Sequence, residues 1–189
     1  MGTIYASVFL ALDGVMEAPH VWHPAYVSEE SMAVLADIMG SATAMLLGRR
    51  TYEEFAGYWP HQPREVPLAE ATNRIRKYVV SQTLSEPRWA NTTVLTGDLT
   101  AAIRTLKDEE GDVLVPGGAQ LVRGLLHEHL LDELHIMLDP IAVGSGRRLF
   151  PEGSAMTRLD LLDARRLPHG VTYLVYKPLS STAAQESPA

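Results

Sequence analysis

Short apolar runs alternate with amphipathic stretches through the first two thirds of the chain, and this alternation limits the fold more than any other feature. Residues 4–12 and 42–47 are apolar and rich in β-forming side chains, which is typical of buried strands. Between them, apolar side chains in residues 34–39 recur at helical spacing and predict an amphipathic helix that begins after Ser28 and ends at Gly40. Strands that alternate with helices form a mainly parallel sheet with helices on both faces, so we expect an α/β fold.

The middle of the chain continues this alternation, and the last third departs from it. After the second strand we expect a helix at residues 49–57, a short helix ending at Arg76, strands at 78–81, 92–95 and 112–115, and helices at 99–106 and 119–129. The last third predicts three strands, at residues 133–138, 159–164 and 171–176, with a tight turn at Pro168-His169-Gly170. The sheet should therefore be mixed, with a C-terminal antiparallel hairpin at its edge. Residues 17–27 hold two prolines and are predicted to form a loop.

The chain is long enough for one domain with a full-sized core, because it has 189 residues. We expect that domain to cover residues 1–178 and a disordered tail to follow at 179–189, where the residues are small and polar without periodicity. No apolar run reaches the length of a membrane-spanning helix, and the first residues lack the basic start of a signal peptide. A cytoplasmic protein without membrane contact is expected.

Composition excludes several classes of site. The chain has no cysteine, which rules out disulfides, thiolate zinc sites and a cysteine nucleophile. Its net charge of −7 argues against a nucleic-acid partner, which requires a basic surface. His127 and His129 lie two residues apart on a predicted helix and so face different sides, which is why no metal site is expected. Any redox chemistry then depends on a bound cofactor.

Gly48-Arg49-Arg50-Thr51 marks the direct passage from a buried strand into a helix. Two arginines in a first helical turn are unfavourable by roughly 0.3–1 kcal/mol each, because the helix N-terminus is already partly positive. An anion would compensate them: free backbone N–H groups, the Thr51 hydroxyl and the Arg49 guanidinium together make a phosphate site. The alternative is that both arginines face solvent or pair with Glu53 and Glu54.

Two further strand ends carry residues that suit a nucleotide. Pro116-Gly117-Gly118 joins a strand to a helix, and its glycines let the backbone approach a diphosphate, although the segment could also be a plain turn. Ser81-Gln82-Thr83 ends another strand without an acid, which favours a phosphorylated ribose, as in NADP, over a free one. The carboxyl ends of parallel strands meet at one edge of a sheet, so the three junctions should share one crevice.

In this order, the segments Leu12-Asp13-Gly14, Leu47-Gly48-Arg49-Arg50-Thr51, Val79-Val80-Ser81 and Val115-Pro116-Gly117-Gly118 resemble the dihydrofolate reductase-like superfamily. Residues 12–19 and 144–151 are most similar to the reductase domain of bacterial riboflavin biosynthesis and its small stand-alone relatives. The resemblance implies a three-layer dihydrofolate reductase-like fold, bound NADPH and a homodimer formed through the C-terminal strands. It also implies a cis peptide at Pro116-Gly117 or Gly117-Gly118.

The resemblance further assigns residues to the cofactor. Gly48, Arg49 and Thr51 would hold its phosphates with help from Arg50, and Ser81 and Gln82 would reach the adenosine 2'-phosphate. Val8 and Met16 would orient the nicotinamide. The diphosphate would be wrapped by the segment Gly117, Gly118, Ala119, Gln120 and Leu121.

The substrate side carries weaker signals. Dihydrofolate reductases place an acid on the first helix, where this chain has Met32, with Glu29 and Glu30 nearly a turn earlier. Glu17 is the expected substrate contact and Glu30 a second choice, although Glu17 could equally be a solvated loop residue. Asp13 also lies near the expected nicotinamide, or only caps a turn. Aromatic and histidine side chains predicted at the mouth of the pocket are His20, Trp22, His23, Tyr26 and Trp59.

Three functions remain open at this stage. The leading prediction is hydride transfer from NADPH to a small planar heterocycle, of the pteridine or aminopyrimidine kind, or to a carbonyl compound. A catalytically silent relative that binds a nucleotide or a flavin is the alternative, because the first-helix acid is missing. A dimeric interaction module is the third.

Overall fold

The computed structural model describes residues 2–179, and they build one eight-stranded sheet in the order β4-β3-β2-β5-β1-β6-β8-β7. The strands are β1 (Ile4–Ala11), β2 (Ala44–Gly48), β3 (Arg76–Val80), β4 (Thr92–Leu95), β5 (Val113–Val115), β6 (Glu133–Asp139), β7 (Leu159–Arg166) and β8 (Thr172–Pro178). Strands β1 to β6 pair in parallel, whereas β8 is antiparallel to both β6 and β7. The mixed, mainly parallel sheet with an antiparallel hairpin at its edge is thus confirmed.

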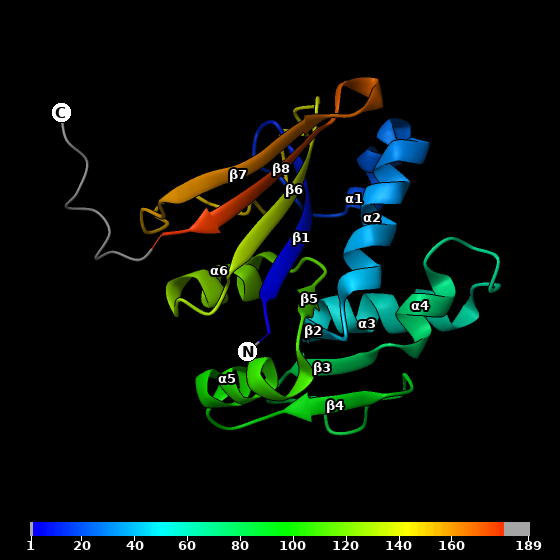
Figure 1. Cartoon of the computed structure of the whole chain (residues 1–189), viewed down its shortest axis with the longest axis vertical. Coiled ribbons are helices and arrows are strands. Elements are labelled where there is room, and N and C mark those ends of the chain that lie inside the picture. The colour runs from blue at the N-terminus through cyan, green and yellow to red at the C-terminus, as the bar shows by residue number, and fades with distance from the viewer. Residues whose placement is uncertain (1, 180–189) are drawn as a thin grey trace.

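Helices cover both faces of this sheet, which gives three layers (Figure 1). The helices are α1 (Pro19–Trp22), α2 (Glu29–Ser41), α3 (Arg49–Tyr58), α4 (Ala69–Arg74), α5 (Leu99–Glu110) and α6 (Ala119–His127), with short 3-10 turns η1 (His23–Tyr26), η2 (Trp59–His61) and η3 (Pro168–Gly170). Figure 1 shows α5 and α6 on one side, and α2, α3 and α4 on the other.

Side-chain alternation in β1 explains why the sheet needs cover on both faces. Ile4, Ala6 and Val8 are buried in the core that α5 and α6 close, whereas Tyr5 is buried in the core beneath α2 and α3. The Tyr5 hydroxyl also donates to the Ile38 carbonyl near the end of α2, at 2.8 Å. Because successive side chains of a strand point to opposite faces, an apolar strand such as β1 has to be buried on both sides.

Two of the longer helices begin at the predicted polar residues. Ser28 and Ser31 form a reciprocal capping box at the start of α2, and the Asp98 side chain accepts a hydrogen bond from Ala101 N at 3.1 Å at the start of α5. Such caps satisfy backbone N–H groups that have no partner inside the helix. The sequence therefore located both starts to within one residue.

Residues 17–27 differ from the prediction of a loop. They contain α1 and η1, two short helical turns that each have a proline in the first turn. Proline is compatible with that position because its missing N–H would have no helical partner there.

The predicted tail lies outside the described residues apart from Leu179. Within residues 2–179, no helix has the length and apolar character needed to cross a membrane.

Candidate functional site

The junction between β2 and α3 has the form that the sequence predicted. Gly48 ends β2 and caps α3 without any side-chain hydrogen bond, so the first-turn N–H groups of α3 remain available. Arg49 reaches in two directions: its Nη1 donates to Thr83 Oγ1 at 2.8 Å, and its Nε lies 3.5 Å from Glu53 Oε1. The pairing of Arg49 with Glu53, which was the alternative to a phosphate site, is therefore present, together with a second contact across the sheet edge.

The junction between β5 and α6 reverses the chain through two glycines. Gly117 has φ +88° and Gly118 has φ +85°, conformations in which a side chain would be strained. Gly118 caps α6, again without a side-chain hydrogen bond. The expected cis peptide at Pro116-Gly117 or Gly117-Gly118 is wrong, since every described peptide bond is trans. Two consecutive left-handed glycines make the same reversal with trans bonds.

These two junctions meet in space. A Cβ atom placed on Gly118 would lie 3.1 Å from Thr51 Oγ1 and 3.9 Å from Leu121 Cβ. A Cβ atom on Gly48 would lie 3.9 Å from the same Leu121 Cβ. The start of α6 thus lies directly against the first turn of α3, and a side chain at Gly118 would crowd Thr51. Both helix N-termini carry partial positive charge, so their convergence creates a local site for anions in a chain of net charge −7.

The end of β3 forms the third part of this edge. Ser81 is buried, and its Oγ accepts hydrogen bonds from Thr83 N at 3.2 Å and Leu84 N at 3.0 Å. Those bonds use the acceptor side of the hydroxyl and leave its hydrogen free to donate. Gln82 is exposed beside it. Thr83, which the sequence analysis did not assign to the site, ties this turn to Arg49.

Strand pairing in the middle of the sheet ends early at the same edge, and we call this break in the pairing the opening. Strand β5 pairs with β1 only at Ile4, Tyr5 and Ala6, and with β2 only at Ala44 and Met45. Both neighbours continue past the end of β5, β1 as far as Ala11 and β2 as far as Gly48.

Beyond β5, those two strands stand two strand spacings apart, or about 10 Å. Backbone groups of β1 that face this opening have no strand partner there within the described chain. The Val8 side chain faces the core beneath α5 and α6 and is 2% exposed, and Met16 packs against the same core.

The acids predicted on the substrate side join two distant loops. Asp13 Oδ2 accepts from Gly144 N at 2.7 Å, and this bond is the main reason that the pKa of Asp13 is lowered. Glu17 accepts from Arg147 N at 2.9 Å and pairs with the Arg147 guanidinium at 2.7 Å. We call this joined pair of loops, residues 12–17 and 144–149, the acid clasp. Glu30 lies apart from it, exposed in the first turn of α2.

The predicted aromatic mouth of the pocket is partly buried. Trp22 and His23 are 8% and 7% exposed, and Tyr26 and Trp59 pack against the core beneath α2 and α3, whereas His20 is exposed. His23 Nδ1 lies 2.7 Å from Asp139 Oδ2, a pairing between residues 116 positions apart that no sequence signal indicated.

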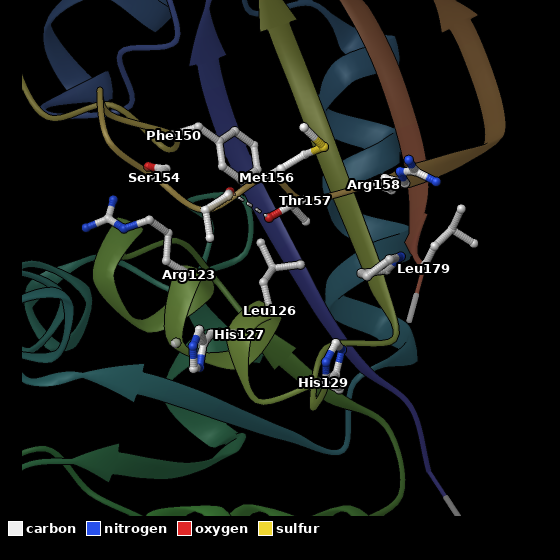
Figure 2. Close-up of a pocket in the computed structure, with 13 residues that line it drawn as sticks. Arg123, Leu126, His127, His129, Phe150, Ser154, Met156, Thr157, Arg158 and Leu179 are labelled. Atoms are coloured by element: carbon white, nitrogen blue, oxygen red, sulfur yellow. Dashed lines mark hydrogen bonds between the residues drawn. The ribbon is translucent and has the colours of Figure 1, made fainter. Parts of the chain in front are cut away.

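A separate cavity of about 680 Å³ lies away from these junctions, between α6 and the segment that precedes β7. Figure 2 shows Arg123 and Leu126 on one side of it and Phe150 and Met156 on the other. None of its lining residues belongs to the three junctions. Within residues 2–179, no group of three or more histidine or acidic side chains is arranged to hold a metal ion.

Comparison with known proteins agrees with this arrangement. The uncharacterised protein YyaP of Bacillus subtilis is 25% identical over 178 residues, which cover 92% of this chain and 93% of YyaP. A pyrimidine reductase-like protein of Corynebacterium diphtheriae superposes with a TM-score of 0.70 at 17% identity, covering 95% of this chain and 93% of that one. RibD of Acinetobacter baumannii superposes with a TM-score of 0.68 at 18% identity, covering 95% of this chain and 58% of RibD.

These structural matches confirm the dihydrofolate reductase-like α/β fold. The model of the RibD C-terminal domain family matches residues 3–173, so nearly all of the sheet and all of the junctions described above fall within it. The chain belongs to the RibD C-terminal domain family.

Proposed function

We propose that this chain is an NADPH-dependent reductase that transfers a hydride to a C=N or C=O bond of a small planar heterocycle, of the pteridine or aminopyrimidine kind, or of a carbonyl compound. One observation carries the proposal: the starts of α3 and α6 converge so closely that a Cβ on Gly118 would lie 3.1 Å from Thr51 Oγ1. Two uncapped helix N-termini at one point suit two linked phosphate groups. The reductase names among its relatives support the same class of activity.

The phosphates would be held mainly by backbone. The first-turn N–H groups of α3, the Thr51 hydroxyl and the Arg49 guanidinium would bind one phosphate, with the exposed Arg50 beside them. The diphosphate would contact the start of α6, formed by Gly117, Gly118, Ala119, Gln120 and Leu121. A Cβ atom on Gly118 would crowd Thr51 Oγ1, whereas glycine leaves the backbone open at this point, so the residues present fit this group.

The adenosine end would lie at the turn after β3. Ser81 has a hydroxyl hydrogen left to donate, Gln82 is exposed beside it, and Arg49 already reaches Thr83 in this turn. An arginine with hydroxyl and amide donors, and no acid, fits a 2'-phosphate better than a free ribose. This is the basis for proposing NADPH rather than NADH.

The nicotinamide end would enter the opening beyond β5. The nicotinamide carboxamide has an N–H donor and a C=O acceptor, as a peptide group of a neighbouring strand does. The unpaired backbone of β1 near Val8 can therefore form hydrogen bonds with it. Met16 lies at the exit of the same strand. When bound, NADPH supplies the hydride, and the chain itself positions the ring, shields it from water and holds the substrate against it.

We also propose two roles for the acidic side chains on the substrate side: shaping the pocket wall and contacting the substrate. Asp13 and Glu17 are engaged in the acid clasp, so they would shape the pocket wall through Gly144 and Arg147. Glu17 would also contact substrate through the lone pairs that remain on its two oxygens, each of which already has one partner in Arg147. Glu30 is the second choice because it stays exposed at the start of α2. Unchanged turnover in Glu17→Gln would remove the substrate role of Glu17.

Cofactor binding gives the direct test. We expect NADPH to raise the melting temperature and to quench or shift protein fluorescence, with NADH much weaker. Arg49→Ala should weaken the free energy of NADPH binding by about 1.5–3 kcal/mol, the range for a hydrogen bond to a charged group. That range equals a roughly 10- to 150-fold rise in Kd. Arg104→Ala removes an exposed arginine from α5 and serves as the matched control. The absence of any stabilisation by NADPH would overturn the proposal.

A catalytically silent nucleotide- or flavin-binding relative is the second candidate. The observation that favours it is the first turn of α2, where Ser28 and Ser31 cap each other and Met32 takes the place expected for an acid. Tight NADPH binding without oxidation by pterin, pyrimidine or dicarbonyl substrates would support this candidate. Tighter binding of flavin than of NADPH would support it as well.

A homodimer is proposed through the C-terminal edge. Strand β7 is exposed along nearly its whole length, with Leu161 and Leu162 each 50% exposed. Beside it, the 680 Å³ cavity is rimmed by Met156, which is 88% exposed (Figure 2). A large apolar surface on an edge strand is typical of a protein interface. Light scattering after size exclusion should give twice the monomer mass, and Leu162→Lys should shift it toward the monomer.

A further inference from the structure

A buried histidine and aspartate lie together at the carboxyl edge of the sheet, outside the junctions assigned to the cofactor. His23 comes from η1 and Asp139 is the last residue of β6, directly beside Ala11 of β1. His23 Nδ1 is 2.7 Å from Asp139 Oδ2, and the two residues are 7% and 0% exposed. The surrounding side chains are apolar, including Trp22, whose ring meets His23 edge on.

Stability alone does not explain this pair. Asp139 Oδ1 is fully buried and has no hydrogen-bond partner within residues 2–179. A buried carboxylate with an unpaired oxygen is costly, and a buried ion pair rarely stabilises a fold more than apolar side chains of the same size would. A carboxylate hydrogen-bonded to one ring nitrogen of a histidine fixes the orientation of the imidazole, as at many functional sites.

The position of His23 relates it to the proposed reaction. Its ring lies on Phe9 with 3.9 Å between the ring centroids, and Phe9 belongs to the part of β1 that continues past the end of β5. The Phe9 side chain packs against the core beneath α2 and α3, next to the stretch of β1 where the nicotinamide is proposed to bind. The Nε2 atom, on the side of the ring away from Asp139, has no hydrogen-bond partner among the described residues and is not a fully buried atom.

The proposed reaction has no other proton source in the place where an acid was expected. Met32 occupies that place on α2, and Asp13 and Glu17 are engaged in the acid clasp. A reduction by NADPH adds one hydride and one proton to the substrate, so a donor is required.

We propose that His23, oriented by Asp139, donates this proton; the assignment rests on the proposed reductase function. When bound, NADPH would supply a hydride to the carbon of the substrate C=N or C=O bond, and the π electrons of that bond would move to its nitrogen or oxygen. That atom takes the proton from His23 Nε2, and neutral His23 keeps Nδ1–H on Asp139 until solvent returns a proton. The products are NADP⁺ and the reduced substrate. Asp139 acts as a positioning residue, because it fixes which ring nitrogen faces the substrate.

The decisive variant is His23→Asn. The asparagine Nδ2 can take the place of His23 Nδ1 and keep the bond to Asp139, but nothing replaces the acidic Nε2 proton. Single-turnover oxidation of bound NADPH is measured with diacetyl, a dihydropterin and a diaminopyrimidine as probes. We expect a roughly 100- to 10,000-fold lower rate in His23→Asn, the usual contribution of a general acid. The NADPH dissociation constant and KM should stay at wild-type values, whereas the melting temperature should fall because the smaller side chain no longer packs on Phe9. His127→Asn, which alters an exposed histidine on α6, is the control.

A solvent isotope effect separates chemistry from structure. The wild-type rate should fall in D₂O, and this effect should change in Asp139→Asn if Asp139 orients the donor. A wild-type rate in His23→Asn overturns the assignment but leaves the reductase proposal intact. A loss of NADPH affinity in His23→Asn makes the residue structural and also overturns it. Binding of NADPH by the wild type without reduction of any probe overturns this assignment and the reductase proposal together.

Discussion

Lys77 on β3 provides a prediction whose size follows from the structure. Its side chain is 1% exposed, and Nζ donates to the carbonyls of Asn73 and Ile75 at 2.9 Å and of Ala90 at 3.2 Å. Nζ also lies 4.2 Å from the centroid of the Trp89 ring. Burial lowers the pKa of Lys77 from 10.5 to about 8.

The sign of the effect follows from proton binding. Between the folded and the unfolded pKa, the unfolded chain holds the Lys77 proton while the folded chain releases it, so the free energy of unfolding rises with pH. A shift of this size corresponds to about 3 kcal/mol over the whole range, of which about 1 kcal/mol appears between about pH 7 and about pH 9. Tyr78 and Tyr5 stay protonated in the folded chain in that window, because burial and Glu110 raise the pKa of Tyr78 to about 12 and burial raises the pKa of Tyr5.

Urea unfolding at several pH values in this window measures the effect. Between about pH 7 and about pH 9, the free energy of unfolding of the wild type should rise by about 1 kcal/mol, which equals roughly 2–4 °C in melting temperature for a chain of this size. Lys77→Met should lose that dependence on pH, while Lys177→Met, which changes an exposed lysine of β8, should keep it. If the free energy of unfolding changed with pH equally in wild type and Lys77→Met, this would falsify the reasoning, because it would show that Lys77 does not change its proton affinity on folding.

Two further predictions concern the edge of the sheet. Gly118→Ala should lower stability by roughly 1–2 kcal/mol, the cost of a left-handed backbone for an L-residue, and should weaken NADPH binding, because the new Cβ meets Thr51 Oγ1 at 3.1 Å. Gly124→Ala, whose Cβ would meet nothing within 4 Å in the middle of α6, is the control in fluorescence titration and should not weaken binding. Asp13→Asn should lower the melting temperature near neutral pH, since the lowered pKa of Asp13 means that its ionised form stabilises the fold. That difference should disappear as the pH falls through the folded pKa of Asp13, and equal melting curves at neutral pH would refute it.

Local sequence predicted the form of the two strand-to-helix junctions well, for physical reasons. The passage from β2 into α3 at Gly48 and the glycine pair before α6 both depend on neighbouring residues, and local rules describe such junctions. Because the carboxyl ends of parallel strands meet at one edge of a sheet, the sequence also predicted that the two junctions lie close together. The close approach of Thr51 to Gly118 agrees with that prediction.

The substrate side could not be predicted in the same way. Contacts such as Asp13 to Gly144 and His23 to Asp139 join residues more than 100 positions apart. No periodicity or motif relates two such segments, and only the folded sheet brings the end of β6 beside the end of β1. Glu17 looked like a free loop acid because its partner, Arg147, belongs to the other loop of the acid clasp.

The short central strand β5 also has a consequence for the order in which the protein is made. It lies between β1 and β2, yet it is synthesised after β1, β2, β3 and β4. Until the ribosome has translated Val113, the nascent chain therefore lacks the strand that pairs with both β1 and β2. Domains in which distant segments pair fold slowly and expose apolar edges meanwhile. We expect the nascent chain to gain protection from protease only after residues 113–115 have left the exit tunnel, in one late step that closes the sheet.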